Sequence, residues 1–314
     1  MNEGRTRTVP PVVAVVGPTA AGKTELSLGL AERLPGEVVN TDAMQVYRGM
    51  DVGTAKLPPD QRRGVPHHLL DLLEVTEPAT VAEFQALARG VVADCRGRGV
   101  APVLVGGSAL YTRAVLDRFE FPGTDPALRA SLEAELDEVG SGALHRRLAE
   151  VDPEAAASIL PGNGRRVVRA LEVVTLTGRP FSATLPAQEY VHLPTVQVGV
   201  RIPRDVLDER IERRVRQMWD DGLVDEVRSL VARGLREGRT APRALGYQQV
   251  LAFLDGSGTE QEAFEATVAG TRRFARRQEA WWRRDARITW VDWDDPQRLE
   301  RALDAVRIAA ASAG

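Results

Sequence analysis

The chain has 314 residues, of which 43% are hydrophobic and 27% are charged, and its formal net charge is −3. This composition is typical of a globular protein, and the length predicts two domains or one large domain with an insertion. The single cysteine, Cys95, excludes an internal disulfide, and the slightly acidic balance excludes a uniformly basic nucleic-acid binder. No apolar stretch is long enough to cross a membrane, so we expect a cytoplasmic protein.

Five segments are expected to form strands of one sheet. Residues 12–16 are a β-branched apolar run that ends at a glycine, which is typical of a strand buried on both faces. A helix over residues 23–34 follows, because leucines recur every four residues until Pro35-Gly36 ends the pattern. Further strands are expected at residues 37–40, 101–105, 195–202 and 288–291, with a helix at 81–98. This alternation predicts an α/β fold with a P-loop NTPase-like parallel sheet core.

The strand pattern is interrupted between residues 124 and 189. Four helices are expected there, over residues 128–139, 142–150, 153–160 and 164–176. We therefore predict an all-helical insertion domain at 124–189 within a catalytic core made of 10–123 and 190–314. Helices dominate again from residue 205. Residues 267–290 carry seven arginines against two carboxylates, a local charge of +5, which favours contact with phosphates.

The sharpest local pattern is G-P-T-A-A-G-K-T, which fits G-x-x-x-x-G-K-[ST] at every fixed position. In such a loop the glycines let backbone amides converge on phosphate oxygens, Lys23 neutralises the outer phosphate, and the Thr24 hydroxyl is a ligand for Mg²⁺. The dipole of the following helix favours the same anion. The sequence therefore predicts a phosphate-binding loop of Gly17, Pro18, Thr19, Ala20, Ala21, Gly22, Lys23 and Thr24.

A phosphate-binding loop alone does not decide the reaction. No later strand is expected to end in an apolar run followed by aspartate, as the second metal ligand of an ATPase requires. Only the second strand is expected to deliver a carboxylate to the same edge of the sheet, so Asp42 should face the phosphate. The alternative is that Asp42 caps a turn. His67 and His68 are adjacent and should point apart without partners, so we expect no metal there.

Several blocks of the chain resemble the bacterial tRNA dimethylallyltransferases (tRNA isopentenyltransferases). Besides residues 17–24 they are N-T-D-A-M-Q-V-Y-R-G-M-D-V-G-T-A-K (40–56), P-H-H-L-L-D (66–71), L-V-G-G-S-A-L-Y (104–111), R-A-L-E-V-V-T-L-T-G-R-P-F-S (169–182), L-G-Y-Q-Q (245–249) and T-R-R-F-A-R-R-Q-E-A-W-W-R (271–283). The resemblance implies Mg²⁺-dependent transfer of a dimethylallyl group from dimethylallyl diphosphate to tRNA. The acceptor is N6 of adenosine 37, directly 3′ of the anticodon, and the products are N6-(dimethylallyl)adenosine and diphosphate.

The resemblance also implies roles for individual residues. Asp42 matches the general base, and Lys23 and Thr24 match the contacts to diphosphate and metal. The residues that match contacts to the tRNA anticodon stem-loop are Asp42, Ala43, Met44, Gln45, Ser108, Arg129, Arg165, Arg166, Arg169, Gly246, Tyr247, Gln248, Arg276, Arg277, Gln278, Trp281 and Arg283. Two positions depart from the family pattern. Ser108 replaces a threonine and keeps the hydroxyl, whereas Ala43 replaces a serine and removes one possible hydrogen bond near Asp42.

The implied chemistry suits these residues. The N6 amine of adenine is a poor nucleophile, so a carboxylate must accept its proton, while cations oppose the charge that grows on the diphosphate. The tryptophans of the basic segment fit either base stacking or the core, and the core is favoured. Three other functions stay open: a small-molecule kinase, a prenyltransferase for free adenine nucleotides, and a nucleotide-gated RNA-binding protein. We expect a monomer.

Overall fold

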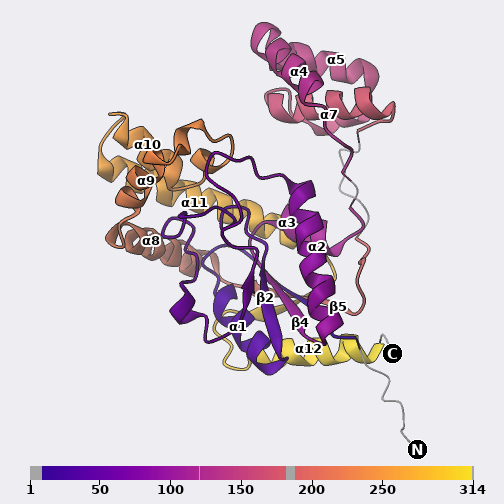
Figure 1. Cartoon of the computed structure of the whole chain (residues 1–314), viewed down its shortest axis with the longest axis vertical. Helices are drawn as coiled ribbons and strands as arrows, with labels where there is room; N and C mark the ends of the chain where they lie inside the picture. The colour runs from indigo at the N-terminus through magenta and orange to yellow at the C-terminus, as the bar shows by residue number, and fades with distance from the viewer. Residues whose placement is uncertain (1–8, 120, 182–187, 313–314) are drawn as a thin grey trace, which may run out of the picture. The chain divides into compact units, whose positions relative to one another are not determined.

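The computed structural model describes residues 9–119, 121–181 and 188–312. The chain divides into two compact units, which we call the core unit (Met1–Leu116 and Tyr190–Gly314) and the helical unit (Asp117–Glu189) (Figure 1). Within the described ranges no helix combines the length and the apolar character needed to span a membrane.

The core unit is built on a six-stranded sheet in the order β3-β2-β4-β1-β5-β6, and every neighbouring pair is parallel. The strands are β1 (Val12–Val16), β2 (Gly36–Asn40), β3 (His67–His68), β4 (Ala101–Val105), β5 (Thr195–Arg201) and β6 (Ile288–Asp292). The predicted α/β fold with a parallel sheet is confirmed. The two-residue edge strand β3 was not predicted, because so short a segment carries no strand pattern.

Helices cover both faces of this sheet (Figure 1). The helices of the core unit are α1 (Lys23–Arg33), α2 (Val81–Arg98), α3 (Ala109–Leu116), α8 (Arg204–Asp220), α9 (Leu223–Ala232), α10 (Tyr247–Leu254), α11 (Glu260–Trp282) and α12 (Arg298–Ser312), of which α1, α2 and α12 pack directly on the strands. Short 3₁₀ helices lie at Pro59–Gln61, Leu235–Glu237 and Ala241–Arg243. Thr259 caps α11, since its hydroxyl accepts the N–H of Glu262 while the Glu262 carboxylate accepts the N–H of Thr259.

The side chains of β1 show how the two faces are filled. All five residues of β1 are fully buried, as predicted for a central strand. Val13 and Val15 belong to the apolar cluster that contains residues of α1, α8 and α12, whereas Val12, Ala14 and Val16 belong to the cluster with α2, α3 and α9. This alternation is the two-residue period of a strand, so burial of both faces fixes the register of the sheet.

The helical unit contains α4 (Pro126–Val139), α5 (Ser141–Val151), α6 (Pro153–Ser158) and α7 (Gly164–Thr177) around its own apolar cluster. Asp125 caps α4 by accepting the N–H groups of Ala127 and Leu128. Proline at the first position of α4 and of α6 supplies a helical φ where no N–H is needed.

The carboxyl ends of three adjacent strands bring three loops to one edge of the sheet. In the order β2, β4, β1, these strands lead into Asp42, into Gly106-Gly107-Ser108 and into residues 17–24. Parallel α/β sheets bind their ligands at this edge. One expectation about the edge is wrong: β6 extends one residue further than predicted and ends at Asp292. That carboxylate is held 2.7 Å from Arg201 at the end of β5.

Candidate active site

The phosphate loop, residues 17–24, joins the end of β1 to the start of α1 at Lys23. Gly17 and Gly22 have φ angles of 134° and 98°, which favour glycine over any other residue. A Cβ at Gly17 would also lie 3.1 Å from the carbonyl oxygen of Val200 on β5. Because the first N–H groups of a helix have no partner inside it, the loop and the start of α1 form a site for an anion.

Two cations, Lys23 and Arg214, lie at this loop. Lys23 Nζ donates to the carbonyl of Pro18 at 2.7 Å, and Arg214 Nη1 lies 3.4 Å from Thr19 Oγ1. Burial, and then repulsion from Arg214, lowers the pKa of Lys23 to about 7, against a smaller opposing effect of Asp42. Burial likewise lowers the pKa of Arg214. In the part of the chain that the structure describes, neither forms an ion pair, so the site has an excess of positive charge suited to a diphosphate.

Arg214 was missed by the sequence analysis. It lies on α8, whose buried residues include Leu207 and Ile211. Arg210 and Arg214 follow Leu207 by three and seven residues, a spacing that continues this buried stripe. The available signal for a functional arginine was its position: it stands where a helix should present an apolar residue to the interior.

Asp42 is held at the edge by the residues before it. The buried amide of Asn40 accepts the N–H of Asp42 at 2.8 Å and donates to the carbonyl of Leu69 at 3.0 Å. One carboxylate oxygen of Asp42 accepts the N–H of Met44 at 2.9 Å, so Asp42 does cap a turn. Because β2 and β1 flank β4, the segment of Asp42 and the phosphate loop leave the sheet at the same edge, and the charge of Asp42 opposes the lowering of the pKa of both Lys23 and Arg214. The two interpretations of Asp42 are therefore compatible.

The loop that follows β4, residues 106–108, supports the segment around Asp42. Thr41 donates its N–H to the carbonyl of Val105, and its hydroxyl lies 2.9 Å from that of Thr112. Ser108 Oγ accepts the N–H of Ala43 at 3.4 Å. Because the backbone of residue 43 makes this contact, alanine there does not remove it. A Cβ at Gly106 would lie 2.3 Å from Thr41 Oγ1, so glycine allows this close approach.

A second set of contacts holds the segment that follows Met44. The Glu226 carboxylate accepts the N–H groups of Asp51, Val52 and Gly53, and the Tyr247 hydroxyl donates to it at 2.5 Å. Gln45 donates to the carbonyl of Thr54 at 3.1 Å. Tyr247, predicted to contact tRNA, is thus fully buried and supports this segment from inside.

The other predicted tRNA contacts differ in exposure. In the core unit Gln248, Arg276, Arg277, Trp281 and Arg283 are exposed, whereas Gly246 and Gln278 are buried. In the helical unit Arg165 and Arg166 are exposed on α7, while Arg129 and Arg169 both pair with the fully buried carboxylate of Glu172. The roles of these residues remain predictions.

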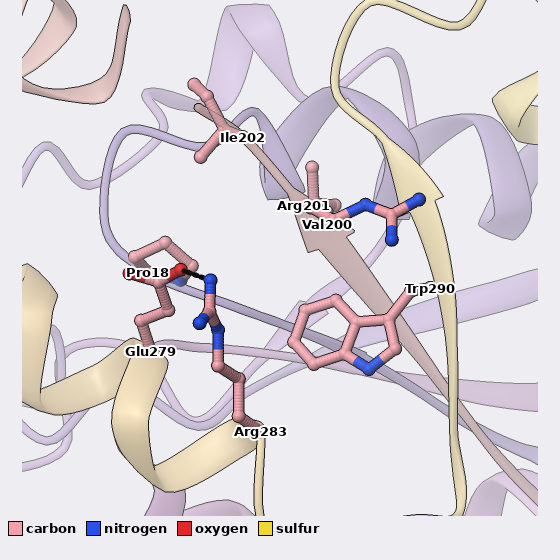
Figure 2. A pocket seen from close by; sticks show the side chains of 7 residues that line it. All are labelled: Pro18, Val200, Arg201, Ile202, Glu279, Arg283 and Trp290. Atoms are coloured by element: carbon pink, nitrogen blue, oxygen red, sulfur yellow. Dashed lines mark hydrogen bonds and ion pairs between the residues drawn. The ribbon is translucent and has the colours of Figure 1, made fainter. Parts of the chain in front are cut away.

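A cavity of about 220 Å³ adjoins the phosphate loop. It is lined by Pro18, Val200, Arg201, Ile202, Glu279, Arg283 and Trp290, and Figure 2 shows the Trp290 ring opposite Arg283. Arg283 is held by Glu279 one turn earlier on α11 at 2.6 Å. Trp282 is in the core, as favoured for the tryptophans, but Trp281 is 40% exposed and Trp290 lines this cavity.

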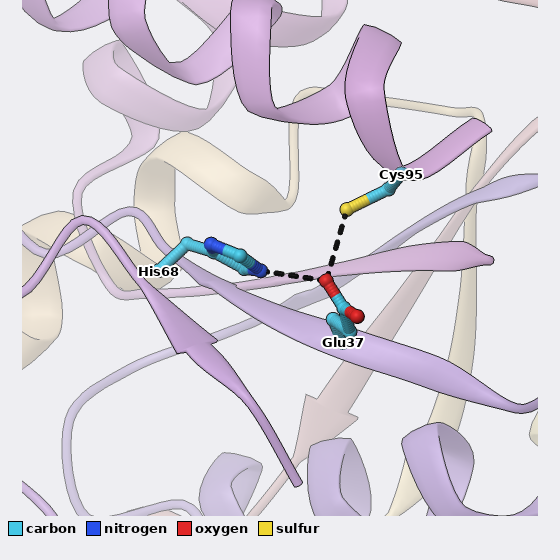
Figure 3. Close-up of side chains that lie close together, drawn as sticks. All are labelled: Glu37, His68 and Cys95. Atoms are coloured by element: carbon cyan, nitrogen blue, oxygen red, sulfur yellow. Dashed lines mark hydrogen bonds and ion pairs between the residues drawn. The ribbon is translucent and has the colours of Figure 1, made fainter. Parts of the chain in front are cut away.

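Glu37, His68 and Cys95 lie together at the opposite end of β2 (Figure 3). One Glu37 oxygen accepts from His68 at 2.7 Å and from the Cys95 thiol at 3.5 Å. The expectation that His68 lacks partners is therefore wrong. Arg98 donates to both Glu37 oxygens, at 2.8 and 2.6 Å, and holds the pKa of Glu37 at about 2. Since a guanidinium already occupies the carboxylate, the cluster is an ion-pair network rather than a cation site.

Comparison with known proteins adds to this geometry. A family model described as IPP transferase matches residues 45–285. A tRNA dimethylallyltransferase of a Nocardioides species is 64% identical over 296 residues, covering 94% of this chain and 96% of that protein. A tRNA dimethylallyltransferase of Thermobifida fusca is 60% identical over 300 residues, covering 94% of each chain.

Solved structures agree with these relatives. The full-length tRNA isopentenylpyrophosphate transferase of Bacillus halodurans aligns with a TM-score of 0.71 at 41% identity, covering 96% of this chain and 97% of that one. A eukaryotic dimethylallyltransferase acting on tRNA aligns with a TM-score of 0.77 over 96% of this chain and 79% of that chain, and at 24% identity this likeness concerns the fold alone. The family model and these relatives span most of the chain, and they show that it belongs to the IPP transferase family.

Proposed function

We propose that the protein transfers the dimethylallyl group of dimethylallyl diphosphate to N6 of adenosine 37 of tRNA, next to the anticodon. The observation that carries the proposal is that Asp42 follows β2 at the same edge of the sheet as the phosphate loop after β1, where the cations Lys23 and Arg214 lie. A base and a diphosphate site are thereby adjacent, which prenyl transfer to an amine requires.

The reaction forms a bond between N6 of adenine and the allylic carbon and breaks the bond from that carbon to the diphosphate. Asp42 takes the proton that N6 loses, which contributes about 10² to 10⁴ in rate. One carboxylate oxygen accepts the N–H of Met44, which holds the side chain, and the other oxygen would accept the proton. Lys23, Arg214 and the loop amides oppose the charge that grows on the leaving diphosphate. No phosphoryl group moves, so an ATPase-type second metal ligand is not needed.

The donor set also fits Mg²⁺. The exposed Thr24 side chain at the start of α1 offers a hydroxyl oxygen, and Mg²⁺ prefers oxygen ligands from one or two protein groups together with substrate phosphates. Bound there, the ion would neutralise part of the diphosphate charge.

Contacts to tRNA are proposed for the exposed arginines. Arg276 and Arg277 on α11 would bind phosphates of the anticodon stem-loop, and Arg165 and Arg166 would do so from the helical unit. The target adenine must leave its stack to reach Asp42, which suits an unpaired base in an RNA loop. We further propose that the protein acts as a cytoplasmic monomer.

The direct test incubates the protein with dimethylallyl diphosphate, Mg²⁺ and unmodified tRNA and then measures the mass of the released nucleosides. We expect N6-(dimethylallyl)adenosine from tRNA whose position 37 is adenosine, and none from a matched tRNA with guanosine there. Equal prenylation of free AMP would indicate a nucleotide prenyltransferase. Phosphate transfer from labelled ATP would indicate a kinase. Binding of RNA without any turnover would indicate a nucleotide-gated binding protein.

A further inference from the structure

Gln278 is a buried amide on the face of α11 that also buries Ala275 and Trp282. Its neighbours Arg276 and Arg277 are exposed, whereas Gln278 is 5% exposed. Its side-chain oxygen accepts the N–H of Thr19 at 2.9 Å, and its side-chain nitrogen donates to the carbonyl of Gly107 at 2.9 Å. One side chain thus joins the phosphate loop to the loop that follows β4.

The chemistry of this bridge requires a primary amide. Thr19 offers a donor and Gly107 offers an acceptor, and among side chains of this length only glutamine both accepts and donates at its end. Glutamate would lose the donor, lysine would lose the acceptor, and methionine would lose both. Burial makes each loss costly, because an unpaired N–H or carbonyl would stay away from water.

Gly107 is shaped to receive this amide. A Cβ at that position would lie 2.2 Å from the Gln278 side-chain nitrogen, closer than real Cβ contacts allow. Any larger residue at 107 must therefore displace the amide. The position of the Gln278 amide therefore depends on glycine at position 107.

The bridge continues to the proposed base. Ser108 follows Gly107, and its hydroxyl accepts the N–H of Ala43, the residue after Asp42. The contacts therefore run from Thr19 in the phosphate loop to Gln278. They continue through the loop that follows β4 to the segment that carries the Asp42 carboxylate.

We propose that Gln278 is a positioning residue that fixes the distance between the phosphate loop and Asp42, and that it acts without touching tRNA. The proposal rests on the proposed function, because it concerns the alignment of leaving group and base. A displacement of about 1 Å at reacting groups lowers rates by about 10²-fold. The RNA contact implied for Gln278 by resemblance predicts a different defect, namely weaker tRNA binding.

The first test compares Gln278→Met with Gln261→Met, an exposed glutamine on the same helix that bonds to Glu265. For Gln278→Met we expect kcat to fall about 10- to 100-fold and KM for dimethylallyl diphosphate to rise. We expect the tRNA dissociation constant, measured by filter binding, to stay within about twofold of wild type, which also shows that the variant is folded. Gln261→Met should match wild type throughout. Loss of tRNA affinity with normal kcat at saturating tRNA would overturn the proposal.

The second test is a double-mutant cycle. Gly107→Ala alone should reduce kcat because its methyl group displaces the amide. In the Gln278→Ala background the space is free, so adding Gly107→Ala should reduce kcat little further. Independent effects, in which the two losses multiply, would overturn the proposal. Absence of prenyl transfer by the wild-type protein and by Gln261→Met would instead refute the proposed function itself.

Discussion

Replacing Glu37 with glutamine should destabilise the core unit in a way that depends on pH. The substitution keeps the shape of the side chain but removes the charge that Arg98 binds through both carboxylate oxygens. These hydrogen bonds, helped by those from His68 and Cys95, lower the pKa of Glu37 from 4.5 to about 2. The folded protein therefore favours the carboxylate far more than the unfolded chain does.

The magnitude follows from this difference in pKa. Each pKa unit corresponds to about 1.4 kcal/mol, so the interval from 4.5 to about 2 corresponds to at most about 3.5 kcal/mol of unfolding free energy. The Arg98 side chain is 44% exposed and its attraction is screened, so we expect between about 1 and 3 kcal/mol. The folded pKa is the lower one, so this contribution is fully present above pH 4.5 and is lost as pH falls toward 2. Less than half should remain at about pH 3.

Urea unfolding followed by tryptophan fluorescence reports on the core unit, which contains Glu37, because all five tryptophans lie in that unit. The matched control is Glu300→Gln, which removes an exposed ion pair with Arg33 and should cost no more than about 1 kcal/mol. The gap between wild type and Glu37→Gln should be largest near pH 6 and shrink on acidification. A Glu37→Gln variant as stable as the control at pH 6, or a gap that does not change with pH, would refute the reasoning.

Three further predictions concern the site. Arg214→Met should lower kcat/KM for dimethylallyl diphosphate about 10- to 100-fold in steady-state assays because it removes a leaving-group contact, while tRNA binding stays intact; a defect confined to tRNA binding would contradict the assignment. Replacing both Arg276 and Arg277 with glutamine should make the plot of log affinity for tRNA against log salt concentration shallower by about 1.4; an unchanged slope would mean that neither meets a phosphate. Tyr247→Phe should cost about 2 kcal/mol in urea unfolding, since it leaves the Glu226 carboxylate without one donor; wild-type stability would show that this hydrogen bond contributes nothing.

The parts of the site that could be predicted are those with a local cause. Gly17 and Gly22 occupy backbone conformations that favour glycine, so the phosphate loop can be identified from the spacing of residues within one short segment. Asp42 lies two residues after the end of β2, and parallel strands bring their carboxyl ends to one edge. The five longer strands could be predicted for the same reason, because the apolar residues within each segment are typical of a buried strand.

The parts that could not be predicted depend on residues far apart in the chain. Arg214 meets Thr19 across 195 residues and Gln278 meets it across 259, and no periodicity reports such a contact. His68 meets Glu37 of β2, which also accepts from Cys95 and Arg98 of α2, so only the packing of these elements reveals the cluster. The carboxylate of Asp292 was missed by one residue at a strand end, where pattern-based boundaries are least reliable.

The most direct test of the proposed site is the single-turnover rate of Asp42→Asn with dimethylallyl diphosphate, Mg²⁺ and tRNA. Asparagine keeps an oxygen for the N–H of Met44 but cannot take the proton from N6. We expect the rate of prenyl transfer to fall about 10²- to 10⁴-fold while the tRNA dissociation constant stays within about twofold of wild type. A transfer rate within a few-fold of wild type would contradict the assignment of Asp42 as the base.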